Sequence, residues 1–173
     1  MSNQEETNLE YTLKNSQKDD WNFYIRTHQE DFSELINLSI SDKQPYSWRA
    51  SWLLSSCIKK NDERVIIYIN SIIDVLPSLQ NNQQRGLLKV LQKMVIDPKY
   101  EGILFDTCAK IWENIKNNPS LRFQALKTMV DMSKKYPDFL NEIILLTDTY
   151  YTENLTEGVK KSVFRIIRSS KDL

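Results

Sequence analysis

The sequence predicts an all-α fold of stacked helical hairpins, and three observations support this prediction. Apolar residues recur with the three- and four-residue spacing of amphipathic helices along most of the chain after residue 20. Only three of the 173 residues are glycines, which is few for a fold that depends on tight turns between strands. A pattern of small and apolar residues also returns about every 37 residues.

The helical spacing extends to a segment whose composition would also suit a strand. Its apolar face is rich in β-branched residues, which favour strands by propensity. The length of the segment and the acidic pair Asp62-Glu63 before it favour a helix, because acidic residues stabilise a helix start. The expected apolar face consists of Val65, Ile66, Ile69, Ile72, Ile73 and Leu76.

The repeat is visible when four segments are aligned on one small residue. The aligned positions are spaced by 36, 39 and 37 residues, and they are Ala50, Gly86, Ala125 and Ser162. Four positions later stands an apolar residue in every segment, namely Leu54, Val90, Met129 and Ile166. A small residue lets two helix axes approach, and the apolar neighbours complete a buried face.

Each segment follows a more acidic helix, so the repeating unit is a helical hairpin. We predict four hairpins, over residues 30–60, 62–96, 99–135 and 137–171. Because one hairpin cannot cover its own apolar face, neighbouring hairpins must stack. A helix over 17–28 is expected to cap the first hairpin. Residues 1–15 are predicted to be an N-terminal tail, disordered or weakly helical, and residues 16–173 a single domain.

The third hairpin carries a resemblance to a known family. Its turn Asn118-Pro119, the pair Leu121-Arg122, the pair Ala125-Leu126 and Met129 resemble the signature of the HEAT repeat, which has an Asp-Pro turn, an apolar-Arg pair and then Ala and Leu. The other hairpins depart from it, with Ser47, Gln83 and Val159 in place of the arginine. The resemblance implies a right-handed α-α superhelix whose second helices line the concave side.

Few residues are suited to catalysis or metal binding. His28 is the only histidine, which excludes a histidine-based metal cluster. Cys57 and Cys108 lie within apolar helical patterns, as reduced core cysteines do. Phosphate-binding glycine motifs, a secretory signal and a membrane-spanning apolar run are all missing. We therefore expect a cytoplasmic, monomeric protein that is not an enzyme, with no catalytic residue, cofactor, metal, small-molecule substrate or membrane partner.

The charges are segregated by helix although the whole chain is neutral. The four second-helix windows, 45–60, 81–96, 119–135 and 157–171, contain fifteen Lys and Arg but only two acidic residues, a net +13. The remainder of the chain therefore carries −13. In a stack of parallel hairpins, equivalent helix faces align, so the second helices predict a basic concave surface that attracts an anionic partner.

The residues expected to line this basic stripe point away from the predicted core: Arg49, Arg85, Lys89, Lys93, Lys127, Lys161, Arg165 and Arg168. Trp48 and Trp52 lie one helical turn apart and flank Arg49, so they are candidate aromatic contacts. Two simpler interpretations remain open. The cations can be solvated or paired within the chain, and both tryptophans can pack against the N-terminal helix.

Two functions follow as hypotheses. The first is a non-enzymatic helical-repeat scaffold that binds an acidic protein segment through the basic stripe. The second is a nucleic-acid-binding module resembling the helical-repeat DNA alkylation repair glycosylases, although no catalytic carboxylate can be assigned here.

Overall fold

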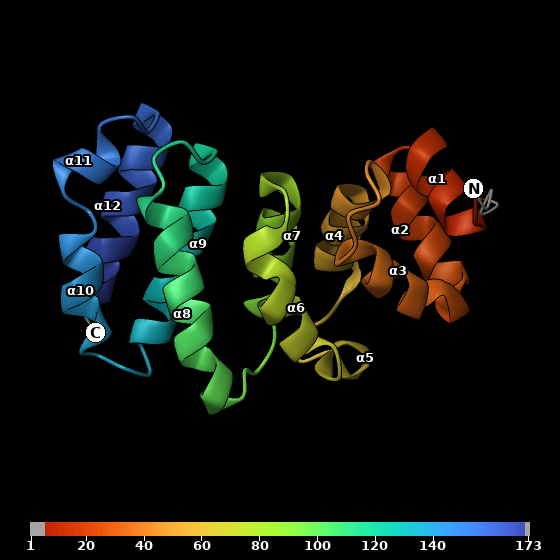
Figure 1. The fold of residues 1–173 in the computed structure, drawn as a ribbon, viewed down its shortest axis with the longest axis horizontal. Coiled ribbons are helices and arrows are strands. Elements are labelled where there is room, and N and C mark those ends of the chain that lie inside the picture. Colours follow the sequence, from red (N-terminus) through yellow and green to blue (C-terminus); the bar gives the residue numbers. More distant parts are fainter. Residues whose placement is uncertain (1–5, 172–173) are drawn as a thin grey trace. The chain divides into compact units, whose positions relative to one another are not determined.

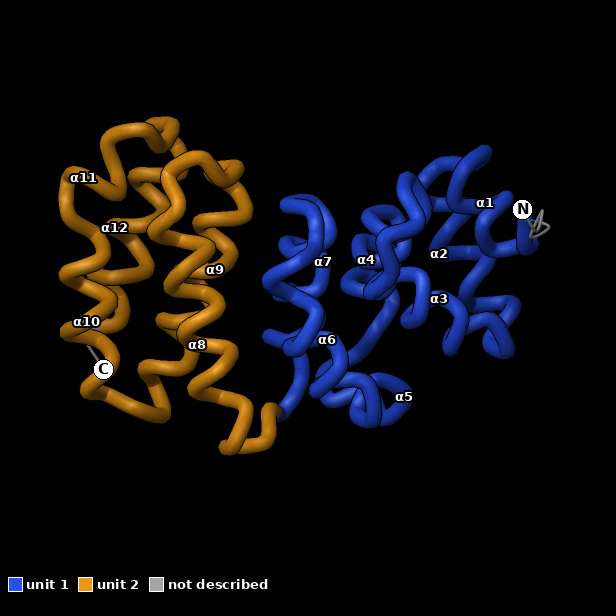
Figure 2. The backbone as a smooth tube through the Cα atoms, viewed as in Figure 1, with its two compact units in different colours: residues 1–95 blue, residues 96–173 orange. Residues whose placement is uncertain are grey.

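The computed structural model describes residues 6–171, with side chains for residues 6–170, and all regular structure within these residues is helical (Figure 1). This confirms the all-α prediction. Contacts divide the chain into two compact units, residues 1–95 and residues 96–173 (Figure 2). Each unit is described by itself below.

Unit 1 contains seven α-helices within its described residues, joined by short turns. Short 3₁₀ turns at Gln29–Asp31 and Leu76–Ser78 connect some of them. The helices are α1 (Asn8–Asn15), α2 (Lys18–Thr27), α3 (Phe32–Ser39), α4 (Tyr46–Cys57), α5 (Glu63–Ile66), α6 (Ile69–Val75) and α7 (Asn81–Leu91).

Unit 2 contains five helices within its described residues. Proline at the first position of two of them suits a helix start, because proline lacks the N–H group that would be unpaired there. The helices are α8 (Pro98–Glu113), α9 (Pro119–Ser133), α10 (Phe139–Leu145), α11 (Thr149–Thr152) and α12 (Glu157–Lys171).

The four predicted hairpins correspond to helix pairs of the structure. The first is α3 with α4, the second α5 and α6 with α7, the third α8 with α9, and the fourth α10 and α11 with α12. Second helices pack on one another within each unit, α4 on α7 and α9 on α12. The hairpin stacking within each unit is therefore that of an α-solenoid.

The aligned small residues lie in the helix contacts. Ala50 and Ala125 are fully buried, and Ser162 is half-buried. Gly86 of α7 lies against α4 so closely that a Cβ atom added there would be 2.6 Å from the Ser51 Oγ atom. The close approach of α4 and α7 therefore depends on the absence of a side chain at residue 86.

Two of the first helices are broken, which the periodicity did not indicate. The expected single helix after Asp62 divides into α5 and α6, with a turn between Ile66 and Ile69. Because the turn interrupts the helical register, Ile66 and Ile67 point outward, and Ile67 is 80% exposed. The expectation that Ile66 belongs to the buried face was therefore wrong.

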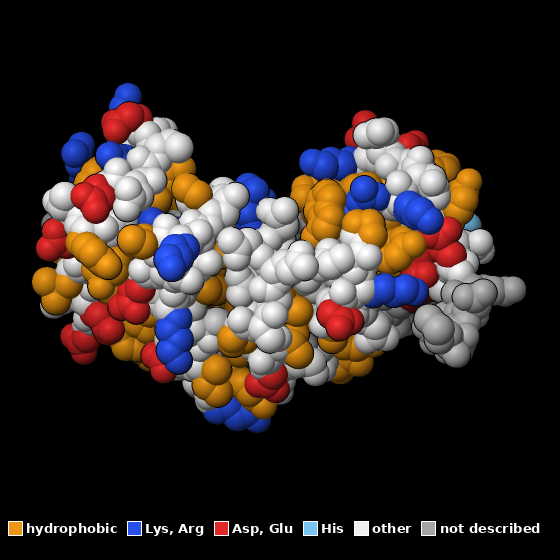
Figure 3. Space-filling view, turned by 45° about the horizontal axis from the view of Figure 1, so that its top comes forward, with side chains coloured by type: hydrophobic (Ala, Val, Ile, Leu, Met, Phe, Trp, Pro, Cys, Tyr) orange, Lys and Arg blue, Asp and Glu red, His pale blue; other side chains and the backbone are white. Residues whose placement is uncertain are grey.

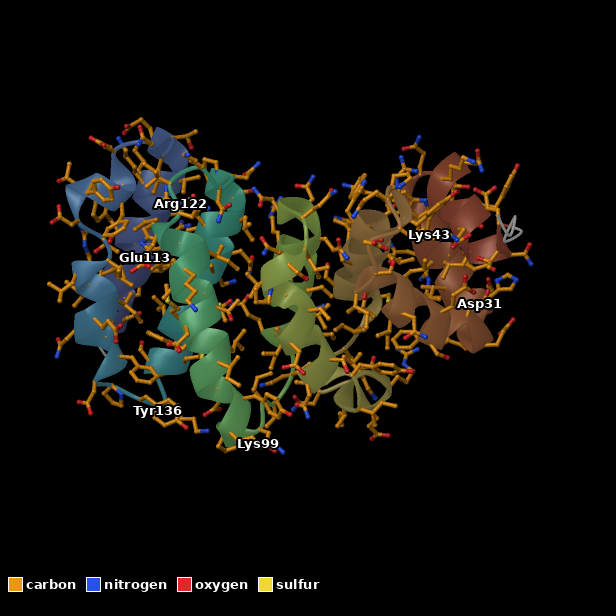
Figure 4. All side chains as sticks on the ribbon, viewed as in Figure 1. Asp31, Lys43, Lys99, Glu113, Arg122 and Tyr136 are labelled. Atoms are coloured by element: carbon orange, nitrogen blue, oxygen red, sulfur yellow. The ribbon has the colours of Figure 1, made fainter. Side chains whose placement is uncertain are left out.

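In two of the four second helices, the polar residue three positions before the small residue donates to main-chain carbonyl groups of other segments. In unit 2 this residue is Arg122, whose Nε atom donates to the Trp112 carbonyl oxygen at 2.7 Å and whose Nη2 atom donates to the Tyr151 carbonyl oxygen at 2.6 Å (Figure 4). In unit 1 the equivalent Gln83 donates to the carbonyl oxygens of Ser39 and Ser41. These bonds satisfy carbonyl groups at the ends of helices, which otherwise lack partners.

Part of the predicted N-terminal tail is a packed helix. Thr7 begins α1 with a capping box, and Leu9 and Leu13 are buried. Glu10 forms an ion pair with Lys43, which ties α1 to the segment before α4. Residues 1–5, which also fall within the predicted tail, lie outside the described residues.

Asp62 begins α5 and is a site of expected pH dependence. Hydrogen bonds from Arg64, the shorter of them 2.8 and 2.9 Å long, lower the pKa of Asp62 from 3.8 to about 2. Because the pKa is lower in the folded chain, the carboxylate stabilises the fold above the unfolded pKa, and this contribution disappears as the pH falls through the folded pKa.

Replacement of Asp62 by Asn should therefore lower the free energy of unfolding by about 2 kcal/mol at neutral pH. The difference from the wild type should shrink as the pH falls from 4 toward 2, because the Asp62 carboxylate of the folded wild type is then about half protonated. Urea unfolding at pH 6 and pH 2.5 measures the difference in the free energy of unfolding between the two chains. An equal difference at both pH values would contradict the role of the Asp62 charge.

Candidate partner-binding groove

A groove in unit 1 is lined by cationic side chains of α2 and α7 and by two tryptophans of α4. Its volume is about 270 Å³, and Lys18 of α2, Trp48, Trp52 and Ser55 of α4, and Asn82, Arg85, Gly86 and Lys89 of α7 line it. Among the residues that the structure describes, the lining therefore contains three cationic side chains and no acidic one. Figure 3 shows Lys and Arg side chains beside hydrophobic ones on one face of unit 1.

The tryptophan wall of the groove is held by aromatic and cation–π contacts. Trp52 packs edge-on against the buried Trp21 of α2, with ring centroids 5.8 Å apart. The Lys18 Nζ atom lies 4.6 Å from the Trp52 ring centroid. Both Trp48 and Trp52 are half-buried, so packing against α2 leaves part of each indole accessible from the groove.

Arg85 is the cation of the groove whose donors are available. Within the described part of the chain it makes no hydrogen bond and no ion pair, and its side chain is half-exposed. A guanidinium presents five N–H donors in a planar fork that suits carboxylate and phosphate groups. Arg85 is therefore positioned to bind an anionic group that enters the groove.

Two other residues of the predicted stripe donate to carbonyl groups within unit 1. Arg49 Nη1 donates to the carbonyl oxygens of Leu13 and Lys14 at 2.6 and 3.0 Å, and it thereby joins α4 to the end of α1. Lys93 Nζ donates to the carbonyl oxygens of Ser55 and Ile58 at 2.7 and 3.0 Å. Both side chains stabilise helix ends inside unit 1, so the intramolecular interpretation applies to them.

A second, more open hollow adjoins the groove. Its volume is about 690 Å³, and it shares Lys18 and Trp48 with the groove while adding Lys14 and Asp19 among other residues. Because the two hollows share Lys18 and Trp48, an extended ligand in the groove can continue along the turn between α1 and α2.

The remaining stripe residues belong to unit 2. Lys127 is exposed on α9. On α12, Lys161, Arg165 and Arg168 surround the exposed Phe164 at a shallow hollow of about 320 Å³. The eight residues thus divide equally between the two units, and their union in one stripe stays a prediction.

Sequence reasoning missed Lys18 and Phe164. Lys18 lies in α2, outside the second helices that were aligned. Phe164 lies two positions after Ser162, outside the aligned small and apolar positions, and it is exposed on α12.

The cysteines and the histidine show no activated chemistry. Burial raises the pKa of the Cys57 thiol to about 11, and burial also raises that of Cys108, so both thiols stay protonated at neutral pH. His28 stacks on Tyr24 with ring centroids 4.2 Å apart. Within residues 6–170, His, Cys, Asp and Glu side chains form no group that could hold a metal ion.

The described helices also include none that is long and apolar enough to cross a membrane. Stacked helical hairpins with a repeated small residue define the class of α-helical repeat proteins. A family model described as HEAT repeat domain matches residues 6–170, so the chain belongs to the HEAT repeat family. No curated protein and no solved structure gave a significant match.

Proposed function

We propose that this protein is a non-enzymatic helical-repeat scaffold whose unit 1 groove binds an acidic segment of a partner protein. The observation that carries the proposal is the lining of the groove, which combines Lys18, Arg85 and Lys89 with two half-exposed tryptophans and no carboxylate. Membership of a family of helical repeats that typically mediate protein interaction supports the same class of function.

The proposed recognition uses two kinds of contact. A carboxylate of the partner pairs with the Arg85 guanidinium, because charge-assisted, bidentate bonds of this kind are the strongest available to an acidic side chain. An apolar or aromatic side chain beside it packs on Trp48 and Trp52, since tryptophan and arginine together are enriched where binding energy concentrates. The positive potential of the groove also accelerates encounter with an acidic chain.

Nucleic acid is the second candidate, and the tryptophans favour it. An indole beside a cation can stack on a base while the cation contacts a phosphate. Trp48 lies 5.4 Å from the guanidinium carbon of Arg49, and Trp52 lies 4.6 Å from the Lys18 ammonium nitrogen. Against it, the acidic Asp19 lies in the adjoining hollow, and the net charge of the chain is zero.

Charge reversal in the groove tests the proposal. The probes are a labelled peptide of about ten residues, rich in Glu and Asp with one central Leu, and a single-stranded oligonucleotide of equal charge. We expect the peptide to bind with a dissociation constant of roughly 10–100 µM in low salt, as weak, transient interactions do. The variant Lys18→Glu/Arg85→Glu should weaken binding by about a hundredfold, because two attractions become repulsions.

A matched variant, Arg26→Glu/Lys60→Glu, reverses two exposed charges of unit 1 outside the groove and should bind like the wild type. Equal binding by both double variants would refute the groove as the site. Preferential binding of the oligonucleotide, with an affinity that falls steeply with salt, would establish the nucleic-acid function instead.

A further inference from the structure

The outer face of α12 is a second surface with the composition of a docking site. Val163 and Ile167 of this helix are buried, and α12 packs on α9. On the opposite side stand Lys161, Phe164, Arg165 and Arg168. Their i, i+3, i+4, i+7 spacing places all four on one stripe, which extends about 10 Å along the helix.

Phe164 is the apolar centre of this stripe. Its side chain is 49% exposed and lines the shallow hollow on α12 together with Ser169. The aligned position two residues after the small residue is Trp52 in α4 and Leu88 in α7, and Leu88 is fully buried. In unit 1 this position is therefore half-buried in α4 and fully buried in α7, whereas the Phe164 side chain in α12 is exposed.

The cations around Phe164 have no acidic partner in the described part of the chain. Lys161, Arg165 and Arg168 form no ion pair there, whereas the neighbouring Lys160 pairs with Glu157 at 3.3 Å. Three positive charges around one aromatic ring attract a surface that is acidic at its edge and apolar at its centre.

We propose that this face of α12 binds an acidic amphipathic helix of a partner protein, at a site separate from the unit 1 groove. The stripe is linear and as long as about two helical turns, so carboxylates spaced by three or four residues on a second helix can meet its three cations. The Phe164 ring packs between the three cations on an apolar side chain of the partner. Amphipathic helices are commonly recognised in this way, through anchor residues at i, i+3, i+4 and i+7.

The single aromatic residue favours a protein helix over a lipid surface. Membrane docking by an amphipathic helix requires a continuous apolar face that enters the bilayer. In α12 that apolar face, with Val163 and Ile167, is already buried in unit 2. The contact area of one stripe is small, so the interaction is weak and transient.

The experiment uses the full chain and two synthetic helical peptides of about sixteen residues. One has a central Leu flanked by Glu at helical spacing, and the other has Gln in place of every Glu. We expect the Glu peptide to bind with a dissociation constant of roughly 10–100 µM and the Gln peptide at least about tenfold more weakly. No binding of the Glu peptide at ~1 mM, or equal binding of the two, would overturn the proposal.

Matched variants assign the site. Phe164→Ala and Arg165→Glu should each weaken binding by about tenfold, because each removes a central contact of a small interface. Leu145→Ala, at a 75% exposed position of α10, and Lys110→Glu, on α8, should leave binding unchanged. Equal effects of Phe164→Ala and Leu145→Ala would refute the α12 site, and circular dichroism confirms that each variant is folded.

Two further measurements separate this proposal from its alternatives. In the Lys18→Glu/Arg85→Glu background the peptide should still bind, whereas loss of binding there would assign the peptide to the unit 1 groove and overturn the α12 site. Vesicles containing phosphatidylserine should not sediment the protein. Phe164-dependent sedimentation, without peptide binding, would replace the protein partner with an anionic membrane.

Discussion

Replacing Gly86 by alanine is expected to lower the free energy of unfolding by about 3 kcal/mol. A Cβ atom at this position would lie 2.6 Å from the Ser51 Oγ atom and 2.9 Å from the Ser51 carbonyl carbon. The second contact is with backbone, which cannot rotate away as a side chain can. The added methyl group must therefore push α4 and α7 apart, and the buried residues around them lose contact.

The matched control is Gly102→Ala on α8. A Cβ atom there meets nothing within 4 Å, so this substitution should stabilise the chain by about 0.5–1 kcal/mol through helix propensity alone. The same chemical change thus has opposite expected signs at two helical glycines. Urea denaturation measures both, and a stabilising Gly86→Ala would show that the two helices separate without cost.

A second-site change separates the two contacts of residue 86. Ser51→Gly removes the Oγ and Cβ atoms but leaves the Ser51 carbonyl carbon in place. Combined with Gly86→Ala, it should recover only part of the lost stability. Full recovery would mean that side-chain overlap, and not the distance between the helix backbones, determines the cost.

Replacing Arg122 by methionine should lower the free energy of unfolding by about 3–4 kcal/mol. The Arg122 side chain is 1% exposed, and its guanidinium carbon lies 4.7 Å from the centroid of the Trp112 ring. Methionine fills a similar volume, but it leaves the buried carbonyl oxygen of Trp112 and the partly buried carbonyl oxygen of Tyr151 without their donor. Unpaired buried carbonyl groups are costly because water cannot replace the lost hydrogen bonds.

Arg122→Lys tests the geometry of these bonds. An ammonium group keeps the charge but has all three N–H donors on one nitrogen, so it cannot donate from two separate positions as Nε and Nη2 of the guanidinium fork do. Arg122→Lys should therefore recover less than half of the free energy of unfolding that Arg122→Met loses. Arg168→Met, which removes an exposed arginine with no ion pair among residues 6–170, should change stability by less than about 0.5 kcal/mol. Equal effects of Arg122→Met and Arg168→Met would contradict the structural role of Arg122.

The site could be predicted only in part, and the second helices show why. Arg49 and Arg85 occupy the same position relative to their small residues, and both were expected to contact a partner from the basic stripe. In the structure Arg49 donates to the carbonyl groups at the end of α1, whereas Arg85 lines a groove and has no such partner within the described part of the chain. A charge pattern along one helix contains no information about which carbonyl groups another helix end brings within reach.

The sequence by itself determined the fold class, the hairpin boundaries and the small-residue contacts, because helical periodicity and a 37-residue recurrence are local properties of the chain. Only the tertiary structure decided which cations donate hydrogen bonds within the fold and where α5 and α6 separate. It also placed Lys18 against Trp52 in the groove that Arg85 lines. Hydrogen-bond partners and grooves depend on residues that are distant in sequence, and packing alone brings them together.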